Sequence, residues 1–233
     1  MFKYFAIFLF LLVPTSSFSQ SQENRVSTDT QNQYENLSLT RVEQRSRDAA
    51  VKVKTLFGYG SGTYTTIAGS RVVLTAAHVV DGENTVEILG RAGETVPGRV
   101  VYRDAPNDFA VISVPEMQTR SPMEFKIARR FSGDNIIGRR VCYTGFPNHH
   151  DLLTIRGSIA GNERGYVILQ TYAWMGASGS GVFDTSGNYV GTLVAVDLGR
   201  YRGMSQIVES VVWVVPIQNI DMAAVRSALR RNN

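Results

Sequence analysis

Three side chains in the sequence stand in contexts that favour proton transfer or nucleophilic attack, and the first is a histidine. His78 follows an apolar run that ends in two alanines, which leave room for close packing beside an imidazole. The ordinary pKa of histidine, near 6.5, suits a general base at neutral pH. Without further support, a lone histidine in such a run is more often a structural residue.

Asp108 and Ser178 are the other two candidates. Asp108 stands at the start of a strand-like run, where a carboxylate can accept the N–H of an imidazole and fix its tautomer; the alternative is an acid that caps a turn. Ser178 lies between Gly176 and Gly179, which allow a tight turn that uncovers the hydroxyl and points main-chain N–H groups at one spot. Such donors stabilise the charge that develops on a carbonyl under attack. The alternative here is a Gly/Ser hairpin.

Other motifs fit known sites less well. The segment after Ser178 lacks the Lys-Ser/Thr of a phosphate-binding P-loop, and Ser180 replaces the second glycine of the α/β-hydrolase motif. Gly58–Gly62 leads into a strand-like run instead of the helix that a dinucleotide loop needs. His149-His150-Asp151 is interpreted as an exposed loop, so no metal site is expected.

The composition excludes several protein classes. The chain has 233 residues, of which 43% are hydrophobic, enough for one or two domains with a buried core. Its only cysteine, Cys142, cannot form an intramolecular disulfide or a cysteine-rich metal site, and its surroundings indicate a small buried hydrophobe. Lys and Arg number 24 against 20 Asp and Glu, a mildly basic balance. Arg129-Arg130 and Arg139-Arg140 are interpreted as solvated loop charge, not as a nucleic-acid site.

The first residues have the pattern of a secretory signal. Lys3 precedes the apolar run Tyr4–Val13, and Ser17 and Ser19 supply the small residues of a cleavage site. Ten apolar residues are too few to span a membrane. We therefore expect residues 1–19 to be a signal peptide that directs export to the periplasm or the medium, with an uncleaved anchor as the alternative.

From Val51 onward the sequence consists of short runs rich in Val, Ile, Thr and Tyr, separated by turn residues. About six runs precede a gap that contains Pro115 and Pro122, and about seven follow it, at a spacing typical of sandwiches and barrels. Asn219–Leu229 has a helical apolar pattern. The expected strands are Val51–Phe57, Gly62–Ile67, Arg71–Thr75, Thr85–Leu89, Val96–Tyr102, Phe109–Val114, Phe125–Ala128, Arg140–Thr144, Leu152–Ala160, Tyr166–Thr171, Gly181–Phe183, Tyr189–Val196 and Ile207–Val215.

With the three candidates combined, the sequence resembles the trypsin-like (chymotrypsin-fold) serine proteases, in particular the compact bacterial Deg-type proteases without disulfides. The resemblance covers about residues 51–216, in the order base, orienting acid, nucleophile. Ala177 and Gly181 depart from it, because members often carry Asp or Asn at the first position and Pro at the second. The motifs that carry it are Gly60-Ser61-Gly62, Leu74-Thr75-Ala76-Ala77-His78-Val79-Val80, Asp108-Phe109-Ala110-Val111-Ile112, Gly176-Ala177-Ser178-Gly179-Ser180, Gly187-Asn188-Tyr189-Val190-Gly191 and Val214-Val215-Pro216-Ile217.

The resemblance implies an all-β fold of two six-stranded antiparallel β-barrels, with the active site in the cleft between them and a short C-terminal helix. It implies that peptide bonds are hydrolysed through an acyl-enzyme intermediate, without a metal or cofactor. Ser178 would be the nucleophile, His78 its base and Asp108 the acid that orients the base. Together with the sequence pattern, the expected segments are a polar leader at 20–50 that includes a short helix at Arg41–Ala50, barrels at 51–118 and 119–217, and a helical tail at 218–233.

The resemblance also implies binding elements around the nucleophile. The backbone N–H groups of Gly176 and Ser178 would form the oxyanion hole. Tyr172 would lie at the base of the primary specificity pocket, with Val194, Ala195 and Val196 along its wall, which favours an apolar side chain before the cleaved bond. Asp197 lies close by in the sequence and leaves a basic side chain as the alternative.

Several alternatives stay open. The chain could be a catalytically silent relative that binds peptides, an esterase with the same triad, or a structural β-protein of the cell envelope. Residues 20–50 could be a propeptide. The expected partners are protein or peptide substrates and no nucleic acid. No globular segment follows Pro216, so we expect no C-terminal PDZ domain of the kind that many Deg-type proteases carry.

Overall fold

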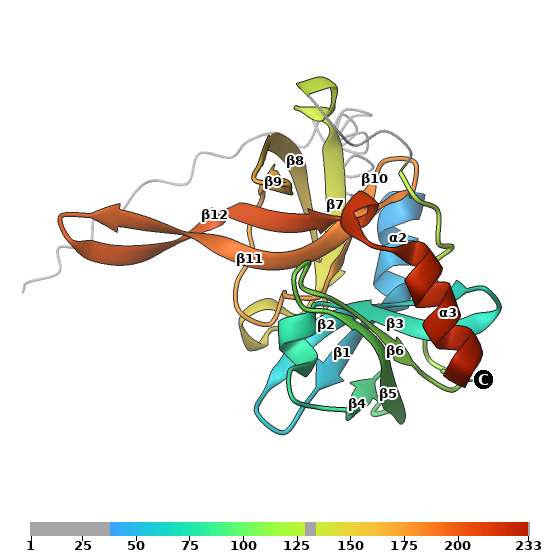
Figure 1. Ribbon diagram of the computed structural model, residues 1–233. Coiled ribbons are helices and arrows are strands. Elements are labelled where there is room, and N and C mark those ends of the chain that lie inside the picture. The colour runs from blue at the N-terminus through green and yellow to red at the C-terminus, as the bar shows by residue number, and fades with distance from the viewer. Residues whose placement is uncertain (1–37, 129–133, 233) are drawn as a thin grey trace, which may run out of the picture. The chain divides into compact units, whose positions relative to one another are not determined.

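Strands dominate the computed structural model, which describes residues 38–128 and 134–232 (Figure 1). Twelve strands of these residues form two closed antiparallel barrels, so the expected all-β fold is confirmed. The first barrel has the order β1-β2-β3-β6-β5-β4 and the second β10-β11-β12-β9-β8-β7. The strands are β1 (Ala50–Lys54), β2 (Tyr59–Ile67), β3 (Ser70–Thr75), β4 (Thr85–Leu89), β5 (Thr95–Asp104), β6 (Phe109–Ser113), β7 (Arg140–Gly145), β8 (Leu153–Glu163), β9 (Tyr166–Gln170), β10 (Gly181–Asp184), β11 (Tyr189–Tyr201) and β12 (Met204–Pro216).

The helices are short and lie outside the barrels. The two α-helices are α2 (Arg41–Ala49) and α3 (Met222–Asn232), and the second confirms the expected C-terminal helix. No helix in residues 38–128 and 134–232 is long and apolar enough to cross a membrane. The expected signal peptide, residues 1–19, lies outside the described part of the chain. The 3-10 helices are η1 (Ala77–Val80), η2 (Asp134–Ile136), η3 (Pro147–His149) and η4 (Ile217–Asn219).

Four of the expected strands differ clearly from the structure. β1 ends at Lys54, because Thr55 N–H donates to Gly58 O and turns the chain, so Leu56 and Phe57 are exposed turn residues instead of strand residues. The expected strand 125–128 forms only an isolated bridge, between Ile127 and Tyr189. The final pair, β11 and β12, is longer than expected, because the strands continue past the barrel towards residue 201 and from residue 204.

Alternation along the strands builds a core inside each barrel. In β1, Val51 and Val53 are buried while Lys54 is exposed, as expected for successive side chains that point to opposite faces.

Cys142 on β7 is buried as predicted, and burial raises the pKa of its thiol to about 12, so it is not a reactive thiolate at neutral pH.

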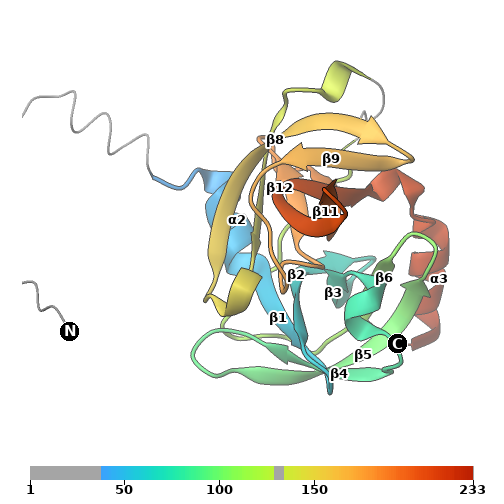
Figure 2. The same cartoon turned by 90° about the vertical axis from the view of Figure 1, so that its left-hand side faces the viewer.

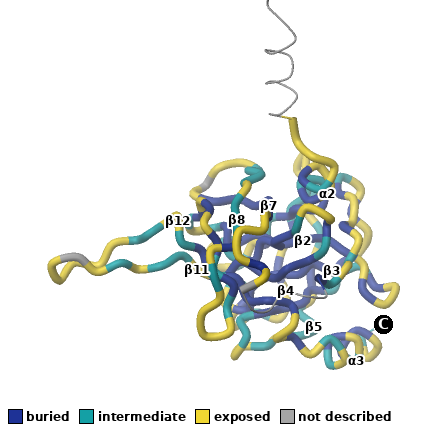
Figure 3. Tube along the Cα trace, turned by 90° about the horizontal axis from the view of Figure 1, so that it is seen from above, coloured by how far each residue is buried: buried dark blue, intermediate teal, exposed yellow. Residues whose placement is uncertain are grey.

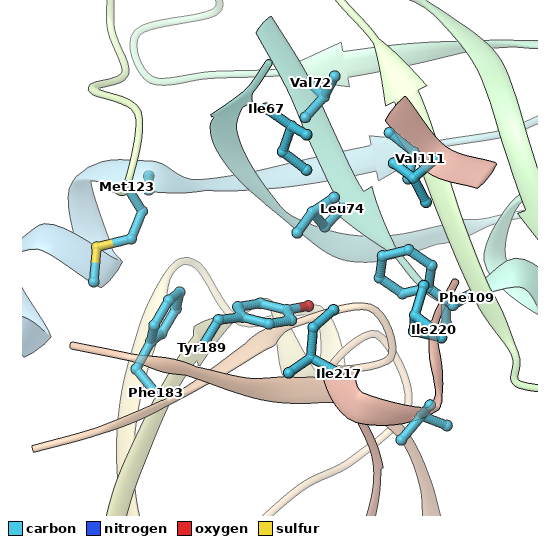
Figure 4. Close-up of a cluster of buried hydrophobic side chains, with 14 of the residues drawn as sticks. Ile67, Val72, Leu74, Phe109, Val111, Met123, Phe183, Tyr189, Ile217 and Ile220 are labelled. Carbon is cyan, nitrogen blue, oxygen red and sulfur yellow. The ribbon is translucent and has the colours of Figure 1, made fainter. Parts of the chain in front are cut away.

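The barrels meet through a third cluster of buried apolar side chains, which we call the seam. In Figure 4, Leu74, Phe109 and Val111 of the first barrel lie opposite Phe183 and Tyr189 of the second. Full burial of one such side chain adds about 1.5–3 kcal/mol to the free energy of unfolding. The members of the seam are Ala49, Ile67, Val72, Leu74, Ala76, Phe109, Val111, Met123, Cys142, Phe183, Tyr189, Val194, Val215, Ile217, Ile220, Val225 and Leu229.

The two helices lie on opposite sides of the barrel pair (Figure 2). Helix α3 places Val225 and Leu229 in the seam and lies near β5, where Arg99 donates to Asn232 O. Helix α2 contacts β2 of the first barrel and β7, β8 and β10 of the second. Helix α2 therefore bridges the two barrels, and α3 packs against the seam from the other side.

Helix α2 is held by a carboxylate that makes two kinds of contact. Thr40 and Glu43 form a capping box, in which each side chain accepts from the other residue's backbone N–H. Both oxygens of Glu43 also accept from Arg156 of β8, through Nε and through Nη2 at 2.9 Å. Glu43 is only 4% exposed, and its hydrogen bond with Arg156 lowers its pKa from 4.5 to about 2 despite the opposing effect of burial.

Replacing this carboxylate should destabilise the fold in a pH-dependent way. Glu43→Gln removes the ion pair with Arg156, and we expect the free energy of unfolding at pH 7 to fall by about 2 kcal/mol. Because the folded-state pKa is depressed, the carboxylate contributes fully above pH 4.5 and its contribution is lost as the pH falls towards 2. Denaturant unfolding of both proteins across this range should show the difference shrinking with acid. Glu163→Gln, which removes an exposed carboxylate beside Arg164, is the control, and an equal loss in both variants would contradict the assignment.

Candidate active site

The first barrel brings together His78 and Asp108, two of the residues expected from the sequence. His78 lies in η1, directly after β3, and Asp108 immediately precedes β6. β3 and β6 are neighbours, with Thr75 opposite Ala110, so the two residues meet although 30 positions separate them. One carboxylate oxygen of Asp108 accepts from His78 N–H at 2.8 Å, and the other lies 2.6 Å from His78 Nδ1.

The environment of Asp108 favours its ionised form. Burial opposes ionisation, but hydrogen bonds from the side chain and backbone of His78 outweigh it and lower the pKa of Asp108. The residue also adopts a positive φ of 46°, a conformation that aspartate tolerates better than most residues. An ionised acceptor at Nδ1 holds the proton there and leaves the Nε2 lone pair of His78 free to act as a base.

The second barrel supplies Ser178 from the loop before β10. Gly176 and Gly179 in this loop have φ of 93° and 91°. A Cβ at Gly176 would lie 2.5 Å from Phe146 O, and a Cβ at Gly179 would lie 2.1 Å from Ser61 O. Both the backbone conformation and the lack of space therefore require glycine on either side of the serine.

Two N–H groups of this loop are available to a ligand. Those of Ala177, Gly179 and Ser180 donate to backbone carbonyls. Within the described residues, the N–H groups of Gly176 and Ser178 donate to no protein acceptor. These are the two donors that the sequence analysis assigned to an oxyanion hole.

The hydroxyl of Ser178 does not contact His78 in this structure. Its Oγ donates to Val194 O at 3.5 Å, at the limit of a hydrogen bond, and no hydrogen bond joins it to His78 among the described residues. His78 and Ser178 nevertheless line the same cavity, of about 500 Å³. The structure therefore brings His78 and Asp108 into direct contact and places Ser178 at the same cavity without that contact.

The walls of this cavity include residues that the sequence analysis did not single out. Phe57, Val79 and Met175 give it apolar side chains, and Asp81 adds one carboxylate. Phe57 is 91% exposed and Met175 69% exposed, although large apolar side chains are usually buried. The sequence signal was the apolar pair before Gly58, which was assigned to a strand instead of a turn.

The four residues expected to form the primary specificity pocket differ in burial and in the groups that they contact. Val194 is buried, and its carbonyl oxygen accepts from the hydroxyl of Ser178. Tyr172 is 38% exposed, and its carbonyl accepts from Tyr143 Oη. Ala195 is exposed, and Val196 packs against the core of the second barrel. None of the four lines the cavity shared by His78 and Ser178. In the described residues, no group of three or more His, Cys, Asp or Glu side chains is arranged to hold a metal ion.

Ser61 of β2 holds the loop at 176–180, which contains Ser178, against the first barrel. Its buried hydroxyl donates to Gly176 O at 2.7 Å and accepts from Phe146 N–H at 3.0 Å. Its own N–H donates to Ser178 O at 2.8 Å, and its carbonyl accepts from Thr75 Oγ1. One residue of the first barrel thus fixes three main-chain groups of the second, two of them in the loop that contains Ser178.

Loss of this hydroxyl should loosen the loop. Ser61→Ala leaves the Gly176 carbonyl and the Phe146 N–H without their buried partner, so we expect the free energy of unfolding to fall by about 2 kcal/mol. Amide hydrogen exchange at Phe146, followed by NMR, should accelerate. Ser186→Ala, in an exposed turn, is the control. Unchanged exchange at Phe146 would contradict the role given to Ser61.

The solved structures with a similar fold are proteases, which agrees with the geometry of the site. No curated protein sequence matches the chain. Its fold is similar to that of the serine endoprotease from Yersinia pestis, with a TM-score of 0.64 and 19% identity over 82% of this chain and 66% of that one, just under two thirds of its length. It is also similar to the inactive form of the Rv3671c protease from M. tuberculosis, with a TM-score of 0.61 and 19% identity over 79% of this chain and 90% of that one.

The sequence itself gives the family. The model of the trypsin-like peptidase domain matches residues 60–191, more than half of the chain, and this range includes His78, Asp108 and Ser178. The chain belongs to the trypsin-like peptidases, a family of serine proteases.

Proposed function

We propose that this chain is an exported serine endopeptidase that hydrolyses peptide bonds through an acyl-enzyme intermediate on Ser178. The observation that carries the proposal is the pair of hydrogen bonds between His78 and Asp108 beside a cavity that Ser178 also lines. Membership of the trypsin-like peptidases supports the reaction class. Export rests on the signal pattern of residues 1–19, outside the described residues.

Acylation begins when a bound substrate draws the Ser178 hydroxyl away from Val194 O. A change of rotamer about the Cα–Cβ bond moves Oγ towards His78 Nε2 without moving the backbone. His78 accepts the hydroxyl proton while Oγ bonds to the substrate carbonyl carbon, and the C=O electron pair moves onto oxygen. The N–H groups of Gly176 and Ser178 stabilise this oxyanion, each worth about 3–4 kcal/mol.

The intermediate then breaks down in two stages. It expels the amine, which takes the proton from His78 and leaves the acyl group on Ser178 Oγ. A water molecule next attacks the acyl carbon while His78 accepts one of its protons. The second tetrahedral intermediate then releases the carboxylic acid product, and His78 returns the proton to Ser178 Oγ. In both stages Asp108 stabilises the imidazolium and keeps its Nδ1 proton in place. The lowered pKa of Asp108 supports this role, because the carboxylate remains an acceptor.

A covalent probe tests the nucleophile directly. A fluorophosphonate should label the protein at Ser178, and Ser178→Ala or His78→Ala should abolish labelling. Ser180→Ala is the matched control, since Ser180 lies two residues away with a buried hydroxyl that has no hydrogen-bond partner in the described structure, and it should label normally. Labelling that persists in Ser178→Ala would sink the assignment. Cleavage of activated esters without cleavage of peptide amides would favour the esterase alternative.

The cavity supports a preference on the leaving-group side of the cleaved bond. His78 protonates the departing amine, so the residue that carries this amine passes over the part of the cavity around His78 and Val79. Phe57 and Met175 are exposed at this cavity, and exposed apolar patches typically mark binding sites. We therefore expect a bulky apolar side chain immediately after the cleaved bond.

Removal of one wall should reduce that preference. For a peptide with leucine after the cleaved bond, Phe57→Ser should lower kcat/KM about tenfold, because the leucine side chain loses an apolar contact. A peptide with glycine at that position should be cleaved as before. Leu56→Ser is the matched control, since Leu56 is 86% exposed in the same turn but lines a different cavity. Equal loss for both peptides, or in both variants, would contradict this assignment.

A further inference from the structure

A second cavity, which we call the outer cavity, lies on the first barrel. It has a volume of about 430 Å³ and lies beside the turn 55–58 and the paired strands β4 and β5. Lys54, Glu87 and Pro97 line it; all three are exposed, and they pair across the neighbouring strands β1, β4 and β5 (Figure 2). Figure 3 shows exposed and half-buried residues along β5, in contrast to the buried interior of the barrels. The outer cavity therefore lies on the outside of the first barrel.

The turn 55–58 separates the outer cavity from the cavity that Ser178 lines, which we call the Ser178 cavity. Thr55 lines both, Leu56 lines only the outer cavity, and Phe57 lines only the Ser178 cavity. Leu56 and Phe57 are 86% and 91% exposed, and exposed apolar patches typically mark binding sites. A polypeptide that crosses this turn therefore meets an apolar side chain in each cavity.

Hydrogen bonds hold this turn in place. Thr55 N–H donates to Gly58 O at 2.9 Å, and Leu56 N–H donates to Glu83 Oε1 at 2.8 Å. Glu83 itself lines the outer cavity. The turn thus presents Leu56 to solvent from a fixed backbone, as is common for binding residues on loops of a rigid scaffold.

Negative charge exceeds positive charge along the two cavities. Asp81 lines the Ser178 cavity and Glu83 the outer cavity. Within residues 38–128 and 134–232, neither carboxylate forms an ion pair, whereas Glu87 pairs with Lys54 at 2.8 Å. A basic side chain of a ligand is therefore complementary to this surface.

We propose that the outer cavity is a second substrate-binding site for the polypeptide segment that follows the cleaved bond, with an apolar side chain of that segment against Leu56 and a Lys or Arg side chain beside Glu83. The proposal rests on the proposed function, because the leaving-group side of the substrate must first pass over Phe57. Since Thr55 lines both cavities, one continuous chain fills them, which favours a substrate over a second copy of this protein.

The path from one cavity to the other sets the position of the recognised residues. An extended chain rises about 3.3 Å per residue, so about four residues lead from the cleaved bond across the turn into the outer cavity. The protease thus selects long polypeptides that carry an apolar and a basic residue at this distance, and short peptides gain nothing from the outer cavity.

A series of peptides tests the proposal. Each carries a Leu-Lys pair at one position between the third and the seventh residue after the cleaved bond, in a background of glycine and serine. Relative to the background peptide, kcat/KM should rise about tenfold when the pair lies near the fourth residue, as expected for one apolar contact and one exposed ion pair. Leu-Glu at the same position should be about threefold worse than Leu-Lys. An equal value at all positions would overturn the proposal.

Two variants assign the gain to the outer cavity, with the ratio of the best peptide to the background peptide as the readout in each protein. Leu56→Ser should remove most of the gain. Glu83→Gln keeps an oxygen that can accept from Leu56 N–H but loses the charge, so it should abolish the preference for Leu-Lys over Leu-Glu. Ile137→Ser is the matched control, since Ile137 is 48% exposed and lines neither cavity, and it should keep the full gain. A full gain in Leu56→Ser would contradict the assignment.

Binding without catalysis gives an independent measurement. In NMR spectra of the Ser178→Ala protein, an acetylated peptide that contains only the residues after the cleaved bond should shift the amide signals of Leu56, Thr85 and Val96, which line the outer cavity. The corresponding peptide of glycine and serine should not shift them. Absence of these shifts with the Leu-Lys peptide would overturn the second site.

The outcomes distinguish the two proposals. Absence of fluorophosphonate labelling in the unaltered protein overturns the proposed function. Normal labelling and cleavage without a gain from the Leu-Lys pair overturns the second site alone. If Leu56→Ser converts an oligomer to a monomer while the gain persists, the turn joins copies of the chain and the proposal fails.

Discussion

Burial of apolar side chains between the barrels is the interaction on which the candidate site depends. His78 and Asp108 belong to the first barrel and Ser178 to the second, so the proposed catalytic groups share a cavity only while the seam holds the barrels together. The single cysteine is a free buried thiol, so no disulfide supports this arrangement. Helices α2 and α3 reinforce it from opposite sides (Figure 2).

Apolar contacts in the seam hold the two barrels together, and hydrogen bonds between the barrels position the backbone of the loop that contains Ser178. Ser61 reaches across to Gly176 and Ser178, while the glycines of the loop permit a backbone shape that other residues could not adopt. The N–H groups of Gly176 and Ser178, the proposed oxyanion donors, are thereby fixed before a substrate arrives, which is the condition for strong electrostatic stabilisation. The Ser178 hydroxyl is held less firmly than its backbone, since its hydrogen bond to Val194 O is 3.5 Å long while Ser178 O accepts from Ser61 N–H at 2.8 Å.

Local sequence patterns predicted most of the barrels and the three catalytic candidates, because strand alternation and the His78 and Ser178 motifs are properties of short segments. Features set by distant pairing were missed. The pairing of β1 with β2 and β4 ends at Lys54, which leaves Phe57 exposed at the cavity instead of in a strand. The segment 197–208, where β11 and β12 extend past the barrel, contains glycines and arginines typical of a loop. It forms a two-stranded ribbon because its residues pair across the strands, from Asp197 with Val208 onward.

The most direct test of the account is a crystal structure of the protein after reaction with a fluorophosphonate. The account predicts phosphorus bonded to Ser178 Oγ, with the phosphoryl oxygen accepting from the N–H groups of Gly176 and Ser178. It also predicts His78 Nε2 beside the adduct, with Nδ1 still bonded to Asp108. Phosphorus on another residue, or a phosphoryl oxygen turned away from both N–H groups, would contradict the central claim that the seam assembles one catalytic site from two barrels.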